Sequence, residues 1–128
     1  MGVSRTFPLP YDAHSGFTAR RYVETFAAEE KLEDDTVAMS IIVSELVTNA
    51  VVHGKGPVEL TLRHERGEVT VEVADADPRL PNVRTPDDHE HCVGGKGLLI
   101  VGSLADRWGT RLSDRGKTVW AAIRTANP

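Results

Sequence analysis

Residues 44–54 read SELVTNAVVHG, and the fold prediction starts from them. At 100° per residue, their polar members Glu45, Asn49 and His53 fall on one stripe of a helix that is apolar almost all round. A carboxylate and a carboxamide in an apolar surface are costly unless they are paired or used. Two interpretations follow from the residues alone. Either Glu45 pairs with a surface cation and Asn49 caps a neighbouring turn, or the stripe belongs to a functional site.

The pattern on either side predicts a small number of regular elements. Apolar residues recur at helical spacing over residues 15–32, and a second helix is expected over 36–53, with Asp34 or Asp35 as its N-cap and Gly54 at its end. A short helix is expected over 97–106. Alternating apolar residues and turn signals predict strands at residues 5–9, 57–63, 68–74, 108–112 and 118–124.

The order of these elements predicts the fold class. Helices that follow one another, and strands that arrive as hairpins, indicate an α+β two-layer sandwich. We expect a mixed, mostly antiparallel sheet covered on one face by helices. The 128 residues are the size of one domain, so residues 1–128 are expected to form a single unit.

Composition and charge exclude several classes of protein. Hydrophobic residues at 40% and charged residues at 27% are values of globular proteins, which excludes disorder along the whole chain. A net charge of -4 offers no general footing on phosphate backbones or anionic lipid, so we expect neither direct nucleic-acid binding nor a membrane partner. Cys92 is the one cysteine, which favours a reducing compartment and a cytoplasmic location.

Residues 75–96 lack periodicity and contain three prolines, and a loop of this length in a small domain is usually functional or disordered. It contains His89, His91 and Cys92, three residue types that bind metals. They lack an obvious fourth ligand, so solvated loop residues are the favoured interpretation and a metal site is the rival.

Both ends of this loop carry residues that can bind polar groups of a ligand. Asp75 ends an apolar strand, where its carboxylate can accept a hydrogen bond from an exocyclic amine; a loop-starting aspartate is the ordinary alternative. Residues 94–97, GGKG, lead into the predicted helix, and free amides with a lysine suit a phosphate; a simple turn is the alternative.

Together these segments resemble the GHKL (Bergerat-fold, histidine-kinase-like) ATPases, and more narrowly the bacterial anti-sigma factor serine/threonine kinases. Residues 44–54 are similar to the N box of that branch, SELVTNA followed by HG. Asp75 is similar to the strand-end aspartate, residues 95–98 to the glycine box, and residues 116–120, GKTVW, to the closing strand motif. The resemblance runs from the first helix to the last strand.

The resemblance implies roles for individual residues. Asn49 would hold a Mg²⁺ that bridges the triphosphate of ATP, and Glu45, one helical turn earlier, would be the base that takes the proton of the attacking hydroxyl. Residues about 78–96 would form the ATP lid. The implied nucleotide contacts are Asp75 with the adenine amino group, Thr118 supporting that contact, and the glycine box Gly95, Lys96, Gly97 and Leu98 with the phosphates.

Two positions depart from the family pattern. A glycine usually follows the strand-end aspartate, but this chain has Asp77, whose side chain and charge would weaken triphosphate binding unless they are offset. Lys96 stands where the glycine box commonly has arginine, and lysine cannot make the bidentate contact of arginine.

The function implied by the resemblance is an ATP- and Mg²⁺-dependent serine/threonine protein kinase that acts as an anti-sigma factor. Its expected partners are a sigma factor and a small antagonist protein that it phosphorylates, and homodimers are usual in this branch. The alternative is a non-catalytic nucleotide-binding switch module that acts by protein–protein contact, which the absence of the glycine after Asp75 favours.

Overall fold

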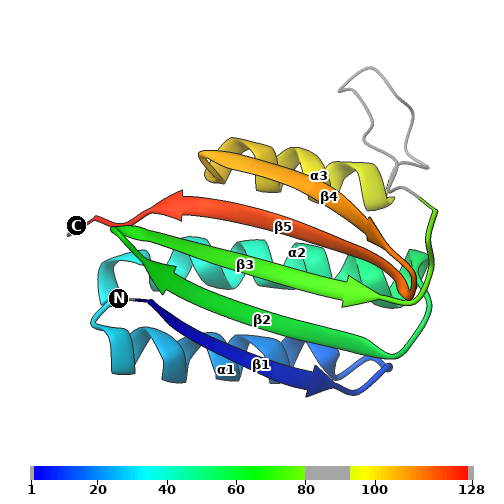
Figure 1. Ribbon diagram of the computed structural model, residues 1–128, viewed down its shortest axis with the longest axis horizontal. Helices are drawn as coiled ribbons and strands as arrows, with labels where there is room; N and C mark the ends of the chain where they lie inside the picture. Colours follow the sequence, from blue (N-terminus) through cyan, green and yellow to red (C-terminus); the bar gives the residue numbers. More distant parts are fainter. Residues whose placement is uncertain (1, 80–92, 127–128) are drawn as a thin grey trace.

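The computed structural model describes residues 2–79 and 93–126, without the side chains of residues 93–96. The described residues form a five-stranded sheet of order β1-β2-β3-β5-β4 and three α-helices that lie on one of its faces (Figure 1). The elements are β1 (Val3–Leu9), α1 (Ser15–Glu30), the 3-10 turn η1 (Glu33–Asp35), α2 (Thr36–His53), β2 (Val58–Glu65), β3 (Glu68–Asp75), α3 (Val93–Leu104), β4 (Arg107–Ser113) and β5 (Gly116–Arg124).

The α+β two-layer prediction is confirmed, with one difference in the sheet. Every neighbouring pair of described strands is antiparallel, so the sheet is antiparallel throughout rather than mixed. Strand residues alternate between the two faces, and the face beneath the helices is apolar. Its buried residues on the three central strands are Val58, Leu60, Leu62, Val69, Val71, Val73, Val119, Ala121 and Ile123.

The middle helix α2 is the centre of the helix layer. It contacts α1 on one side and α3 on the other, and it also contacts β3 (Figure 1). Residues Glu33–His53 are long and apolar enough, by length and composition alone, to cross a membrane. Here that apolarity has another use, because Met39, Ile42, Leu46 and Val47 are all buried in the core.

Backbone conformation, and not side-chain capping, marks where α1 ends and α2 begins. Helix α1 ends at Glu30 because Lys31 adopts the left-handed conformation, φ 59°, and donates its N–H to Ala27 O. Asp35 is the N-cap residue of α2, but its side chain makes no capping hydrogen bond. Asp35 thus takes the predicted N-cap position without the side-chain hydrogen bond expected of it. Its carboxylate instead accepts the N–H of Ala126 at 3.2 Å and fastens the end of the chain.

Helix α3 begins at Val93, four residues before the predicted start at residue 97, and it ends at Leu104. Residues 94–97 are therefore helical rather than a turn before the helix. The first four N–H groups of an α-helix have no partner within the helix. In α3 these groups belong to residues 93–96, so the amides of Gly95 and Lys96 have no partner within the helix.

Candidate functional site

The three residues of the polar stripe on α2 differ in how deeply they are buried. Asn49 is buried, Glu45 is half-buried and His53 is exposed. Within residues 2–79 and 93–126, the side chains of Glu45 and Asn49 make no hydrogen bond or ion pair. The first of the two sequence interpretations had Glu45 paired with a cation and Asn49 capping a turn. Neither contact is present in the described part of the chain. An unpaired carboxylate and carboxamide on a buried helix are available to a ligand.

The glycine box meets Glu45 through Gly97. A Cβ placed on Gly97 would lie 2.6 Å from Glu45 Oε2, which is closer than atoms can approach without moving. The absence of a side chain at residue 97 thus lets the Glu45 carboxylate rest directly against α3. This contact sets the free N-terminal end of α3 beside the polar stripe of α2.

Asp75 lies at the end of β3, next to the end of α2. A Cβ on Gly54 would come within 2.7 Å of Asp75 Cγ, so the carboxyl group occupies the space that a side chain would need. The carboxylate accepts the N–H of Asp77 at 2.7 Å and the ammonium of Lys117 at 3.1 Å. Lys117 also donates to the carbonyl of Asp77 at 3.0 Å, and all three residues are buried.

The charge of Asp77, which stands where a glycine is expected, is neutralised inside the protein. Arg79 donates to its carboxylate from Nη2 at 2.6 Å and from Nε, and the backbone N–H of Arg79 donates at 2.9 Å. These hydrogen bonds, the side-chain ones first, hold the pKa of Asp77 well below its ordinary value of 3.8. The carboxylate is 1% exposed and therefore presents little free negative charge to a neighbouring triphosphate.

The remaining glycine-box residues divide into two groups. Gly95 and Lys96 lie in the first turn of α3, and the Lys96 side chain is outside the described residues. Leu98 is 1% exposed and belongs to the hydrophobic core, so it anchors α3 in that core. Leu98 contributes to the site by fixing the position of α3 rather than by offering a polar contact.

Thr118 lies apart from Asp75. In the register of β3 and β5, Asp75 faces Lys117 and Ala74 faces Thr118. Because side chains alternate across a strand, Thr118 projects to the sheet face opposite the Asp75 carboxylate. The structure therefore brings Lys117, and not Thr118, beside the strand-end aspartate.

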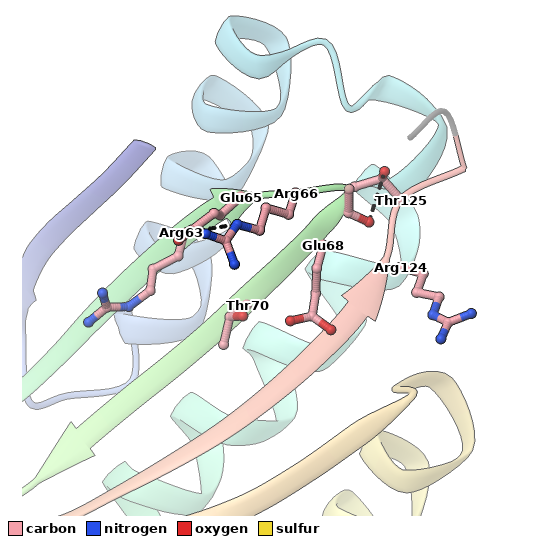
Figure 2. Close-up of a pocket in the computed structure, with 8 residues that line it drawn as sticks. Arg63, Glu65, Arg66, Glu68, Thr70, Arg124 and Thr125 are labelled. Carbon is pink, nitrogen blue, oxygen red and sulfur yellow. Dashed lines mark hydrogen bonds and ion pairs between the residues drawn. The ribbon is translucent and has the colours of Figure 1, made fainter. Parts of the chain in front are cut away.

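Two other features need separate mention. The three metal-binding candidates His89, His91 and Cys92 lie outside the described residues, and no cluster of three or more potential ligands occurs among the residues described. A polar hollow lies at the opposite end of β3, about 23 Å away at 3.3 Å per residue. Figure 2 shows its lining, which is Arg63, Glu65, Arg66, Gly67, Glu68, Thr70, Arg124 and Thr125.

The two ends of the arrangement are separated by a defined length. Gly54, directly after α2, lies against Asp75. Glu45, nine positions earlier and on α2 itself, lies against Gly97. At 1.5 Å per residue this is a span of about 14 Å, with Asn49 between the two ends. A span of this kind fits an extended nucleoside triphosphate, with its base at Asp75 and its last phosphate near Glu45.

Sequence reasoning missed Lys117, Arg79 and the close fit of Gly54. Lys117 had a signal, because it and Asp75 both lie on the apolar face of their strands once the register is known. Arg79 follows Asp77 by two residues, a spacing at which an aspartate commonly accepts the backbone N–H. The contact of Gly54 with Asp75 joins residues far apart in the chain and has no local signal.

The chain was compared with protein-family models, curated proteins and solved structures. A family model described as the histidine kinase-like ATPase domain matches residues 10–123. Among curated proteins, no sequence matches the chain. The chain is similar to a solved structure of the RsbU and RsbW domains of Rv1364c from Mycobacterium tuberculosis, with a TM-score of 0.72 and 19% identity. The alignment covers 98% of this chain but only 33% of that one.

Proposed function

Because this chain belongs to the histidine kinase-like ATPase domain family, we propose that it binds ATP with Mg²⁺ and transfers the γ-phosphoryl group to a serine or threonine of a partner protein. The observation that carries the proposal is the span along α2. Along α2 and the residue that follows it lie Gly54, which leaves room for the Asp75 carboxyl group, then the carboxamide of Asn49 and the carboxylate of Glu45. This is the order that base, phosphates and attacking hydroxyl require.

The base of ATP is assigned to Asp75. Its carboxylate is held by Lys117 and by the Asp77 N–H, which leaves acceptor capacity for the amino group of adenine. The phosphates are assigned to the N-terminal end of α3, where the free N–H groups and the helix dipole favour negative charge. The negative charge of Asp77 does not weaken triphosphate binding in this arrangement, because Arg79 neutralises it.

Asn49 fits a magnesium ion by the chemistry of its donor atom. Mg²⁺ prefers oxygen ligands and shares them with phosphates and water, and the carboxamide oxygen of Asn49 is a hard donor with no protein partner among the described residues. When bound, the ion would neutralise charge on the phosphates. The chain supplies its protein contact through Asn49.

Glu45 supplies the remaining chemistry of the transfer. The hydroxyl oxygen of the partner's serine or threonine forms a bond to the γ-phosphorus, the bond from the γ-phosphorus to the bridging oxygen breaks, and ADP leaves. The hydroxyl proton goes to the Glu45 carboxylate. Glu45 is half-buried, and within residues 2–79 and 97–126 no cation pairs with its carboxylate, which suits that proton-accepting role.

The experiment that tests this assignment separates binding from transfer. Glu45→Gln is expected to abolish phosphoryl transfer and leave the ATP affinity within about twofold, because Gln keeps the shape but cannot accept the proton. Asn49→Ala is expected to lose Mg²⁺-dependent ATP binding. Affinity is measured by titration calorimetry and transfer with γ-labelled ATP and candidate antagonist proteins. Thr48→Ala, an exposed neighbour on the same helix, is the control. Full transfer by Glu45→Gln removes the residue from the role.

We propose as partners a sigma factor and a small antagonist protein, with the antagonist as substrate, and a cytoplasmic location. The likeness of the chain to a structure containing an RsbW domain supports this class of partner. The alternative is a switch module that binds ATP without turning it over. Persistent binding of ATP without label transfer to any antagonist that the protein binds would favour the switch.

A further inference from the structure

Lys117 occupies a position that the proposed site does not by itself explain. It is 4% exposed, and in the register of β3 and β5 it faces Asp75 directly. Its ammonium lies 3.1 Å from each of the two carboxyl oxygens of Asp75. A lysine is rarely buried to this degree unless it is paired, so this pairing is a specific feature of the fold.

The same ammonium fixes two parts of the Asp75 environment at once. Besides the carboxylate, it donates to the carbonyl of Asp77 at 3.0 Å, and the N–H of Asp77 in turn donates to Asp75 Oδ1 at 2.7 Å. Lys117 therefore holds the side chain of Asp75 and the backbone turn that supports it. A carboxylate has about four acceptor positions, so these contacts leave room for one more donor.

We propose that Lys117 is a positioning residue for nucleobase selection, acting through Asp75. By holding the carboxylate in one orientation, it lets the site distinguish a purine nucleotide that carries an exocyclic amine from one that lacks it. This inference rests on the proposed function, since it takes Asp75 to be the acceptor of that amine. Lys117 itself contacts Asp75 and Asp77 and has no assigned contact with the nucleotide.

The test compares ATP with purine riboside triphosphate, which differs from ATP only in lacking the amino group. The measured quantity is the ratio of the two dissociation constants, obtained by titration calorimetry on the full chain with Mg²⁺. The wild type is expected to prefer ATP by at least about tenfold, the usual effect of a hydrogen bond to a charged group. Lys117→Met is expected to reduce the preference to within about twofold, mainly by weakening ATP binding.

A double-mutant cycle distinguishes positioning from general support of the fold. Asp75→Asn should remove most of the preference, and adding Lys117→Met to it should remove little more, because both changes act on one contact. A lysine that only stabilised the fold would weaken both nucleotides equally and leave the ratio intact. Arg111→Met is the matched control, because it also removes a cation paired with a strand carboxylate, Glu72, on the other sheet face.

Each outcome bears on a different claim. An unchanged ratio in Lys117→Met overturns the inference alone. A wild type that binds both nucleotides equally overturns the base contact and, with it, the inference, while phosphate binding stands. A wild type that binds neither nucleotide overturns the proposed function as well. Circular dichroism checks folding, and if Lys117→Met does not fold, Lys117→Gln must lower the ratio by at least about threefold.

Discussion

At the scale of single residues, Gly97 shows how a missing side chain can shape a site. Alanine is favoured over glycine inside a helix by up to about 1 kcal/mol, so Gly97→Ala is not expected to lower the free energy of unfolding. Its Cβ would nevertheless displace the Glu45 carboxylate, which lies 2.6 Å from that position. We expect phosphoryl transfer to fall by about tenfold or more, as for a misplaced catalytic group. Transfer assays and urea unfolding measure the two effects.

The control for Gly97→Ala is Gly16→Ala in α1. There the added Cβ would meet only the Arg20 guanidinium, at an ordinary 3.4 Å. This variant should gain stability and transfer phosphate normally. Unaltered transfer in Gly97→Ala would contradict the role given to the Glu45 position.

Arg79 gives a prediction about pH. Because Arg79 lowers the pKa of Asp77 in the folded protein, the pair contributes stability at pH values above the ordinary pKa of 3.8. That contribution is lost as the pH falls through the lower folded value. Arg79→Met should therefore be less stable than the wild type at neutral pH, and the difference should shrink progressively below pH 3.8. Urea unfolding over a pH series measures it.

Arg66→Met serves as the control for this series, because Arg66 is 89% exposed and its nearest approach to a carboxylate is 3.7 Å. It should show no such pH-dependent difference. A difference between Arg79→Met and the wild type that is constant down to acidic pH would show that Arg79 acts without the Asp77 charge.

At the scale of elements, the sheet face without helices is joined by ion pairs. Glu72 on β3 accepts Arg63 Nε from β2 at 2.8 Å and Arg111 Nη2 from β4 at 2.6 Å. Arg107 on β4 pairs in the same way with Glu68 at 2.8 Å. The Glu72 side chain is 10% exposed, whereas those of Arg63 and Arg111 are about half exposed. Water can therefore solvate the arginines when the ion pairs are lost, but it reaches the Glu72 carboxylate far less.

This difference predicts an asymmetry between variants. Glu72→Met frees two arginines that water can solvate, so it should cost no more than about 1 kcal/mol. The double variant Arg63→Met with Arg111→Met leaves a buried carboxylate unpaired and should cost about 2–3 kcal/mol. Urea unfolding gives both free energies. Equal losses in the two variants would show that the burial of Glu72 does not matter.

At the scale of the whole molecule, the helix layer and the sheet share one core, so a ligand held by α2, β3 and α3 should stabilise the entire chain. At one hundred times its dissociation constant, ATP with Mg²⁺ should raise the free energy of unfolding by about 2.7 kcal/mol. For a chain of this size that corresponds to a rise in melting temperature of roughly 10 °C. Differential scanning calorimetry with and without nucleotide measures it.

Two variants make this whole-molecule prediction specific. Glu45→Gln should keep the full stabilisation by ATP, because Glu45 is proposed to act in transfer and not in binding. Asn49→Ala should lose most of it, together with the effect of Mg²⁺. A rise of the same size in Asn49→Ala would mean that the ion is held elsewhere.

The amino-acid pattern was enough to predict the fold class and its regular elements. Periodicity is a local property, so residues 36–53 were predicted as a helix with the bounds that the structure has. Alternation found all five strands within two residues at each end. Two details were less predictable. The Asp35 side chain at the N-cap binds the N–H of Ala126, a residue far along the chain, and α3 begins at Val93 rather than at residue 97.

The sequence also identified the chemical groups of the candidate site, because a carboxylate and a carboxamide on an apolar stripe stand out in any helix. Which of these groups lie in contact depends on how the elements pack. The register of β3 and β5 put Lys117 rather than Thr118 beside Asp75, and a shift of one residue in an antiparallel pair changes the face of every side chain. The contacts of Gly54 with Asp75 and of Gly97 with Glu45 likewise exist only because separate elements pack closely, and no spacing along one chain segment encodes them.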